Sequence, residues 1–336
     1  MTINRAGSRT TILQRFTVGI TKFSPVFLVI VFTIVMGLLR QRFLSIANLL
    51  TVASQIIPMG LIALGQTLVL ISAGIDLSTS QGIAIVSIVI GVVYSITDSI
   101  VLALCLGLIS GLFLGLLNAT LIVKMKLPAF IVTLGTMAII DGAVFLVMGT
   151  LKKVAFIDHP IFSFLGYGEI GKIPISFLIM SVIYLIVFII YKYHRFGTYL
   201  IAIGSDESGA RLAGINVERI RFVVYLLSGL FMSIAGIFMV ARLPIVQPIS
   251  AGTNTLLLNS IAAAVIGGTS LLGGKGTIQG TFVGVIFMGL VGNALNMLNV
   301  DPNHQMMYSG LIILSAILFD VFINSGKIIY RLSLEK

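Results

Sequence analysis

The chain has 336 residues, of which 58% are hydrophobic and 10% are charged, whereas a soluble domain carries about 25% charged residues. With a mean hydropathy of +1.14, so few charges cannot cover the surface of a soluble protein, and the composition predicts an integral membrane protein. The net charge of +10 does not indicate a nucleic-acid partner, because the basic residues are scattered singly or in pairs between apolar runs.

Apolar stretches that could cross a bilayer recur along the whole chain. A transmembrane helix needs about 20 mainly apolar residues. The pattern predicts an all-α, polytopic integral membrane protein with about ten transmembrane helices in a single domain over residues 23–325. The expected helices cover residues 24–39, 47–73, 79–96, 99–123, 128–148, 175–193, 222–241, 256–270, 278–298 and 305–324.

The distribution of Lys and Arg predicts the orientation of these helices. With the N-terminus in the cytoplasm, 15 basic residues fall inside and 6 outside, which accounts for all 21. Residues 1–22 and 326–336 are therefore expected to be a cytoplasmic N-terminal segment and a cytoplasmic tail. The first apolar run is long for a signal peptide and lacks a small-residue cleavage signature, so we interpret it as an uncleaved first helix.

Two polar segments separate the helices. Residues 149–174 contain several Gly and Pro residues and are predicted to form an external loop. Residues 194–221 hold three acidic and four basic residues and form the largest predicted cytoplasmic feature. A partner protein is most reasonably expected to dock on this second segment.

The apolar runs are interrupted in two corresponding places, at 71–82 and 266–277. Each interruption is rich in Gly and Ser, is predicted to be cytoplasmic, and leads into another apolar run. Paired interruptions in the two halves of a membrane protein indicate an internal repeat and broken helices beside a translocation path.

Polar residues inside the predicted spans are candidates for that path, because each is costly unless it faces protein or water. Uncharged amides and hydroxyls dominate, which favours a neutral, hydrogen-bonding solute over an ion. The alternative for any one of them is a hydrogen bond between helices. The path residues that we predict are Gln66, Asp76, Ser78, Asn118, Thr133, Thr136, Asn293 and Asn296.

The sequence predicts no nucleotide, metal or catalytic site. In the Gly-rich segment 267–277, Thr269 and Gly276 stand where a phosphate-binding loop needs Gly and Ser or Thr. The three His residues lie far apart in the sequence, and no cluster of His, Cys and carboxylates suggests a metal site or an enzyme. The single cysteine, Cys105, is interpreted as a small buried apolar residue.

Five segments in order resemble the membrane permeases of ribose-type ABC importers, which carry monosaccharides. They cover roughly residues 45–320. The segments are ALGQTLVLISAGIDLSTS (63–80), LPAFIVTLGTMAIIDG (127–142), AIGSDESGARLAGINVERIRFVVYLLSGL (202–230), ARLPIVQPISAG (241–252) and IAAAVIGGTSLLGGKGTIQGT (261–281).

The resemblance implies a permease subunit in the cytoplasmic (inner) membrane of a prokaryote. Its implied partners are an ABC ATPase subunit, an extracytoplasmic sugar-binding protein and a second permease subunit, either identical or paralogous. ATP and Mg would be used by the ATPase, and this chain would bind no cofactor. The family has a short coupling helix where this chain has 204–220. The ATPase-coupling residues carried over are Gly204, Asp206, Glu207, Ala210, Arg211 and Gly214.

The expected function is therefore inward passage of a ribose-like monosaccharide by ATP-driven alternating access. The chain departs from the family at Ala119 and Ser80, which replace Gly, and at Asp141, which replaces Arg. It also carries Leu257, Leu258 and Asn259 where the family has Glu-Leu-Asp, so two carboxylates are missing. The cargo thus stays open among sugars, nucleosides, branched-chain amino acids and furanose-like signal molecules. A stand-alone secondary transporter or channel for a small neutral solute is the alternative.

Overall fold

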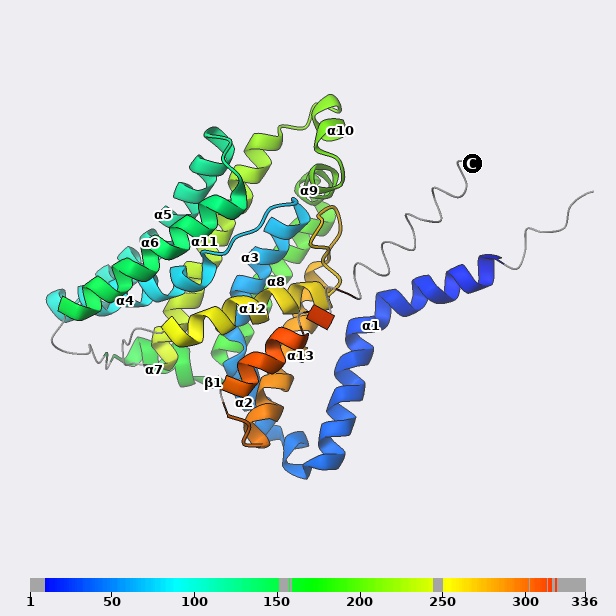
Figure 1. Ribbon diagram of the computed structural model, residues 1–336. Helices are drawn as coiled ribbons and strands as arrows, with labels where there is room; N and C mark the ends of the chain where they lie inside the picture. The colour runs from blue at the N-terminus through cyan, green and yellow to red at the C-terminus, as the bar shows by residue number, and fades with distance from the viewer. Residues whose placement is uncertain are drawn as a thin grey trace, which may run out of the picture.

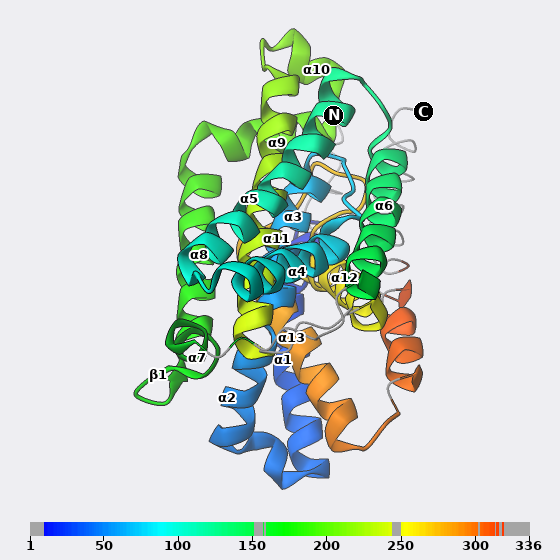
Figure 2. The ribbon, with the colours of Figure 1, turned by 90° about the vertical axis from the view of Figure 1, so that its left-hand side faces the viewer.

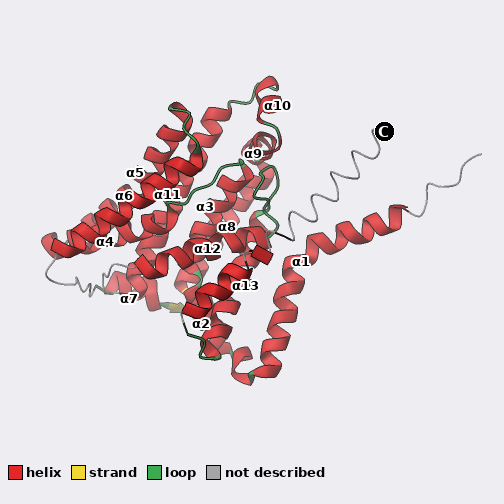
Figure 3. Cartoon of the chain, viewed as in Figure 1, coloured by secondary structure: helices red, strands yellow, loops and turns green. Residues whose placement is uncertain are grey.

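The computed structural model describes residues 10–150, 157, 159–243, 250–301, 303–312, 314, 315 and 318. Helices make up nearly all of this part, with one two-stranded hairpin (Figure 3). The elements are α1 (Thr10–Leu39), η1 (Gln41–Leu44), α2 (Ile46–Gln55), α3 (Ile57–Ile71), α4 (Thr79–Thr97), α5 (Ile100–Ala119), η2 (Thr120–Lys124), α6 (Ala129–Thr150), α7 (Pro160–Tyr167), β1 (Glu169–Ile170), β2 (Ile173–Pro174), α8 (Ile175–Tyr193), α9 (Arg195–Ser205), α10 (Glu207–Leu212), α11 (Val217–Arg242), α12 (Ser250–Ile266) and α13 (Ile278–Met297).

The all-α prediction is confirmed, whereas the count of ten spans stays a prediction. Among the described residues, six helices are long and apolar enough to cross a membrane, and α2 with α3 makes a seventh if the bent pair is one span. The first and eighth expected spans correspond to shorter apolar helices, Pro25–Leu39 and Thr255–Ile266. The last expected span lies partly outside the described residues, and the side of the membrane on which each terminus lies is likewise a prediction.

The expected second span is broken into α2 and α3, which meet at an angle of 51°. The break falls at Ile56, and Pro58 follows in the first turn of α3, where its missing N–H leaves no helical hydrogen bond unmade. Ser45 caps α2 by accepting a hydrogen bond from the Asn48 N–H. The sequence predicts interruptions at 71–82 and 266–277, where α3 and α12 end and α4 and α13 begin, but it does not predict this break within 47–73.

Helix α3 is the centre of the bundle. All of its residues are buried, and it contacts α8, α11, α12 and α13. A helix that is apolar apart from Gln66 and Thr67 and buried throughout is typical of a core position. Tyr184 of α8 donates a hydrogen bond to the Gly60 carbonyl (2.7 Å), and the hydroxyls of Thr67 and Thr281 are 2.6 Å apart, so α8 and α13 are both tied to α3.

Small residues let α5 and α11 approach each other almost backbone to backbone. Gly107, Gly111 and Gly115 are spaced by four residues on α5, which places them on one face. A Cβ atom at Gly115 would stand 2.7 Å from the Tyr225 carbonyl oxygen and 2.9 Å from the Gly229 Cα. Such contacts between small residues are a usual means of packing helices in membranes. We call this contact the glycine seam.

Helix α4 begins inside the bundle, and the cytoplasmic side of the 71–82 interruption stays a prediction. Ser78, Thr79, Ser80 and Gln81, around its start, are all buried. In both ribbon views α4 runs across the bundle rather than along it, and α12 also runs across in Figure 1 (Figures 1 and 2). Before α4 starts, residues 72–78 lie along α11 and are hydrogen-bonded to it.

The remaining short elements lie toward the two ends of the bundle. Figure 1 shows α9 and α10 at one end and α2 with the β1–β2 hairpin toward the other. The segment 149–174, predicted as an external loop, contains α7 and this hairpin in its described part. Tyr167 donates a hydrogen bond to the carbonyl of Arg242 (2.6 Å), which fastens α7 to the end of α11.

Candidate functional site

The segment predicted to couple the chain to a partner folds into α9, α10 and the turn before α11. Asp206 caps α10 by accepting a hydrogen bond from the Ser208 N–H (3.0 Å). Gly214 follows the helix with φ +77°, a left-handed conformation that glycine adopts without steric cost. Asn216 accepts from the Arg219 N–H and caps α11. The short helix implied for 204–220 is therefore present as α10, between Asp206 and Gly214. We call α10 with these two residues the docking element after its predicted role.

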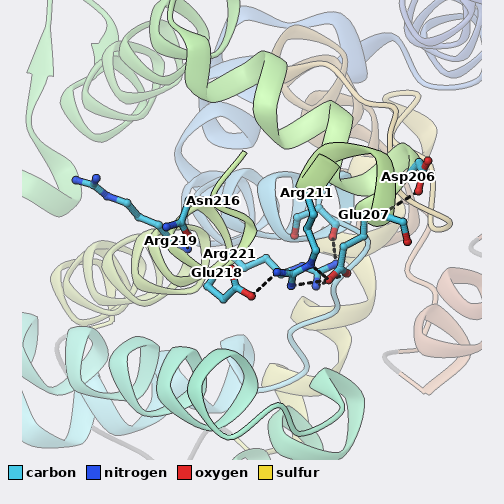
Figure 4. Close-up of polar contacts among 9 residues, drawn as sticks. Asp206, Glu207, Arg211, Asn216, Glu218, Arg219 and Arg221 are labelled. Carbon is cyan, nitrogen blue, oxygen red and sulfur yellow. Dashed lines mark hydrogen bonds and ion pairs between the residues drawn. The ribbon is translucent and has the colours of Figure 1, made fainter. Parts of the chain in front are cut away.

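Four charged side chains form an alternating cluster between α10 and α11. Glu207 pairs with Arg211 (2.9 Å) and with Arg221 (2.6 Å), and Arg211 also pairs with Glu218 (2.5 Å). Figure 4 shows these four side chains pointing toward one another while Arg219 points away. The four residues are called the charge cluster below.

The charge cluster keeps the Glu207 carboxylate ionised. Partial burial raises the pKa of Glu207, but the hydrogen bond from Arg211 and the positive charge of Arg221 outweigh it, and the net pKa is lowered. A lowered pKa means that this carboxylate stabilises the fold above the ordinary glutamate pKa, and that the stabilisation is lost as pH falls through the lowered value. Because the side chain is 38% exposed, solvent screens the pairs strongly.

Apolar contacts pack α10 against α9 and α11, but one apolar side chain of α10 stays exposed. Ala210 is buried in a small cluster with Ile203 of α9 and Val217 of α11. Leu212, at the end of α10, is 91% exposed. This leucine was not among the predicted coupling residues. In the sequence, Leu212 is recognisable only as an apolar residue within a polar segment. The structure adds that no neighbouring side chain covers it.

Gly204 lies where three segments meet. The Gly274 N–H donates to the Ile71 carbonyl (2.9 Å), joining the end of α3 to the second Gly-rich interruption. A Cβ atom at Gly204 would overlap that carbonyl oxygen and stand 2.5 Å from the Gly274 nitrogen. The absence of a side chain at 204 therefore allows α9 to rest on both interruptions at once.

Four of the predicted path residues form one hydrogen-bonded cluster in the interior. Asp76 accepts from the Ser78 hydroxyl (2.6 Å), and the Asn118 amide donates to the same hydroxyl (2.8 Å). The Gln66 amide donates to the Asp76 carbonyl and to the Thr79 hydroxyl (3.2 Å). We call these residues, Gln66, Asp76, Ser78 and Asn118, the inner polar cluster.

The other predicted path residues are placed differently. Thr133 reaches the Ile75 carbonyl (3.5 Å) beside the inner polar cluster, whereas Thr136 donates to carbonyls of its own helix. Asn293 exchanges two hydrogen bonds with Asn48 (2.9 and 3.0 Å), and Asn296 accepts from Gln305 (2.8 Å). These asparagines thus link α13 to α2 and to the helical residues that follow 303, apart from the inner polar cluster.

Several buried polar atoms have no hydrogen-bond partner within the described part of the chain. Two belong to the inner polar cluster, Gln66 Oε1 and Asn118 Oδ1, and two more lie in the first turn of α4. In α4 these are Ser80 Oγ and Gln81 Oε1, which the predicted path did not include. Such atoms can accept or donate hydrogen bonds to a polar solute. No group of three His, Cys, Asp or Glu residues in the described ranges could hold a metal ion.

The chain is similar to known transport proteins over most of its length. The family model described as branched-chain amino acid transport system / permease component matches residues 48–317. The ribose import permease protein of Haemophilus influenzae is 35% identical over 301 residues, 89% of this chain and 93% of that protein. The ribose import permease protein of Bacillus subtilis is 36% identical over 299 residues, 89% and 92% of the two chains.

A relative with another sugar in its name is also similar. The fructose import permease protein of Rhizobium meliloti is 31% identical over 320 residues, 93% of this chain and 88% of that protein. No solved structure matches the chain significantly. The resemblance indicated by the five ordered segments is confirmed.

Proposed function

The chain belongs to the family of branched-chain amino acid transport system / permease components, and from this premise we propose that it is the membrane permease subunit of a monosaccharide importer. Ribose, or a sugar close to it, is the proposed cargo, since sugar import permeases are the similar proteins. The chain itself makes and breaks no covalent bond. An ABC ATPase subunit hydrolyses ATP with Mg, and an extracytoplasmic binding protein delivers the sugar to a dimer of permease subunits in the cytoplasmic (inner) membrane.

The observation that carries this proposal is the pairing of a capped docking element at one end of the bundle with a polar cluster inside it. The charge cluster, Gly204 and exposed Leu212 supply a rigid, charged and partly apolar surface of the kind that a partner protein recognises. The inner polar cluster offers uncharged amides and hydroxyls, with acceptor atoms free for the hydroxyl groups of a sugar. Alternating access would expose these groups to one side of the membrane at a time.

Reconstitution tests the proposal directly. Liposomes containing the chain, its partner ATPase and the sugar-loaded binding protein are expected to accumulate labelled D-ribose only with Mg-ATP. Labelled L-arabinose, D-fructose and leucine compare the alternative cargoes. Accumulation by the chain alone under an ion gradient would instead establish a secondary transporter, and leakage in both directions without any energy source would establish a channel.

Replacement of Leu212 by serine is expected to weaken binding of the ATPase. Burying a leucine side chain contributes about 1.5–3 kcal/mol, so its loss corresponds to a Kd increase of about 10- to 100-fold. Binding of the purified ATPase to the permease in lipid nanodiscs measures this effect. Leu212→Met keeps an apolar side chain and is the matched control. Equal affinities for Leu212→Ser and the native chain would place the docking contact elsewhere.

A further inference from the structure

We propose that Arg221, Tyr225 and Ser228 form a positioning strip on α11 that transmits movement of α10 to the start of α4. The inference rests on the proposed function for its transport consequence, but its structural part does not. The strip acts on residues 72–78, which we call the inner segment. None of the three residues was singled out in the sequence as a coupling or path residue.

The three side chains share one face of α11 and contact successive parts of the inner segment. They are spaced by four and three residues, so they lie in a row along the helix. Arg221 Nη2 donates to the Ser72 carbonyl (3.4 Å), Tyr225 to the Ile75 carbonyl (3.3 Å) and Ser228 to Asp76 Oδ2 (2.8 Å). Seven residues of helix correspond to about 10 Å, so the strip guides the segment from the end of the bundle into its interior.

The inner segment depends on these contacts because it has no regular secondary structure. Ser72, Asp76 and Ser78 are fully buried, and Ala73 adopts a left-handed conformation with φ +58°. Buried backbone carbonyls in a membrane protein need partners, and here α11 supplies two of them, Arg221 and Tyr225, beside Gln66 of α3 and Thr133 of α6. The segment is therefore held by a few specific hydrogen bonds rather than by a helix of its own.

Asp76 connects the strip to α4. One carboxylate oxygen accepts from Ser228, and the other accepts from the Ser78 N–H (3.0 Å) and hydroxyl (2.6 Å). Ser78 is the N-cap residue of α4 and receives the Asn118 amide from α5. A shift of the inner segment along α11 must consequently move the first turn of α4, where Ser80 and Gln81 carry free polar atoms. In this role Asp76 is a positioning residue.

The opposite end of the strip lies in the docking element. Arg221 Nη1 pairs with Glu207 of α10, while Nη2 of the same guanidinium reaches the Ser72 carbonyl. A cavity of about 390 Å³ lies next to this link and is lined by Ala73, Gly74, Glu207, Arg221 and Tyr225, among others. The inner segment thus has both a connection to α10 and open space into which it can move.

Single substitutions along the strip test separately its hydrogen bonds to the inner segment and its link to α10. Tyr225→Phe and Ser228→Ala each remove one hydrogen bond to the inner segment, and Arg221→Gln removes the ion pair with Glu207. Hydrogen exchange is measured on the permease alone in lipid nanodiscs. In Tyr225→Phe and Ser228→Ala, the amides of 72–80 are expected to exchange about 2- to 10-fold faster, which corresponds to the loss of one hydrogen bond. Arg219→Gln is the matched control, since its side chain points away and makes no ion pair among the described residues (Figure 4).

The transport part is tested in the complete transporter. Arg221→Gln is expected to import at least about fivefold less ribose for each ATP hydrolysed, because the two ends of the strip are uncoupled. This ratio separates uncoupling from weaker docking of the ATPase, since weaker docking lowers ribose import and ATP hydrolysis together and leaves the ratio unchanged. Arg221→Lys, which keeps a positive charge beside Glu207, should recover part of the ratio, and Arg219→Gln should keep it. Native exchange rates in Tyr225→Phe and Ser228→Ala, or a native ribose-to-ATP ratio in Arg221→Gln, would overturn the strip. Faster exchange in a chain that imports no sugar with the ATPase would instead contradict the proposed function alone.

Discussion

Exchanging the charges of Glu207 and Arg211 in the double variant Glu207→Arg/Arg211→Glu is expected to abolish sugar uptake while the protein still inserts into the membrane. The two substituted residues could still pair with each other across one helical turn. However, the arginine at position 207 would face Arg221, and the glutamate at position 211 would face Glu218. The charge cluster would then contain two like-charge contacts, and the surface offered by α10 would be inverted.

The stability of the fold should change little, because the side chains of the cluster are between 25% and 46% exposed. Exposed ion pairs contribute about 0.2–1 kcal/mol each, which is small for a protein of this size. Uptake of labelled ribose, the amount of permease in the membrane and its binding to the ATPase are the three measurements. Native uptake by the double variant would remove α10 from the docking surface.

Two further variants distinguish repulsion from simple loss of charge. Glu207→Gln combined with Arg211→Gln removes the ion pairs without creating like-charge contacts, so it should retain more uptake than the double reversal. Arg219→Glu reverses one charge on the same end of the bundle, outside the cluster, and should transport normally. If Arg219→Glu also abolished uptake, the general charge of this end would matter rather than the arrangement of the cluster.

Replacing Gly204 with alanine is expected to lower both the stability of the fold and transport, although it adds only one methyl group. The new Cβ would overlap the Ile71 carbonyl oxygen and approach the Gly274 nitrogen, and these two backbone groups are already hydrogen-bonded to each other. Neither is a flexible side chain that could turn away. Overpacking costs about 1–3 kcal/mol, and a contact with backbone on two sides belongs at the upper end of that range.

Thermal unfolding in detergent, followed by size-exclusion chromatography, and ribose uptake in vesicles measure the effect. We expect a Tm lower by several degrees. We also expect reduced uptake, because α9 must move away from the Ile71 carbonyl and would displace α10 with it. Gly310→Ala is the matched control, because a Cβ at this helical position would meet nothing within 4 Å. A native Tm and native uptake for Gly204→Ala would contradict the three-segment contact.

Local features of the candidate site could be predicted from the sequence, since they depend on residues close together in the chain. Asp206 caps α10 through a hydrogen bond to Ser208, and Gly214 ends the element in a left-handed conformation. Both follow from the short-range chemistry of helix ends. The interruption at 71–82 was also recognisable, because Gly and Ser broke an apolar run.

Long-range partners could not be predicted in this way. Ser228 lies 152 residues from Asp76, and a serine in an apolar helix has no sequence feature that names its partner. Asn293 matched the pattern of a path residue, yet it pairs with Asn48, 245 residues away. The start of α4 at Thr79 agrees with the predicted span 79–96, whereas the contacts of the inner segment with α11 depend on residues far apart in the chain, which hydropathy alone does not encode.

The glycine seam has a consequence for which parts of the protein can move during transport. Where side chains meet, helices can slide because rotamers rearrange, but at Gly115 and Gly229 the backbones themselves are in contact. Helices α5 and α11 should therefore travel as one rigid body, which keeps Asn118 and Ser228 at a fixed separation throughout the cycle. The bend at Ile56 between α2 and α3, by contrast, is followed by Pro58, which has no N–H to hold the angle with a helical hydrogen bond. We therefore expect α2 to change its direction relative to α3 more easily than α5 relative to α11.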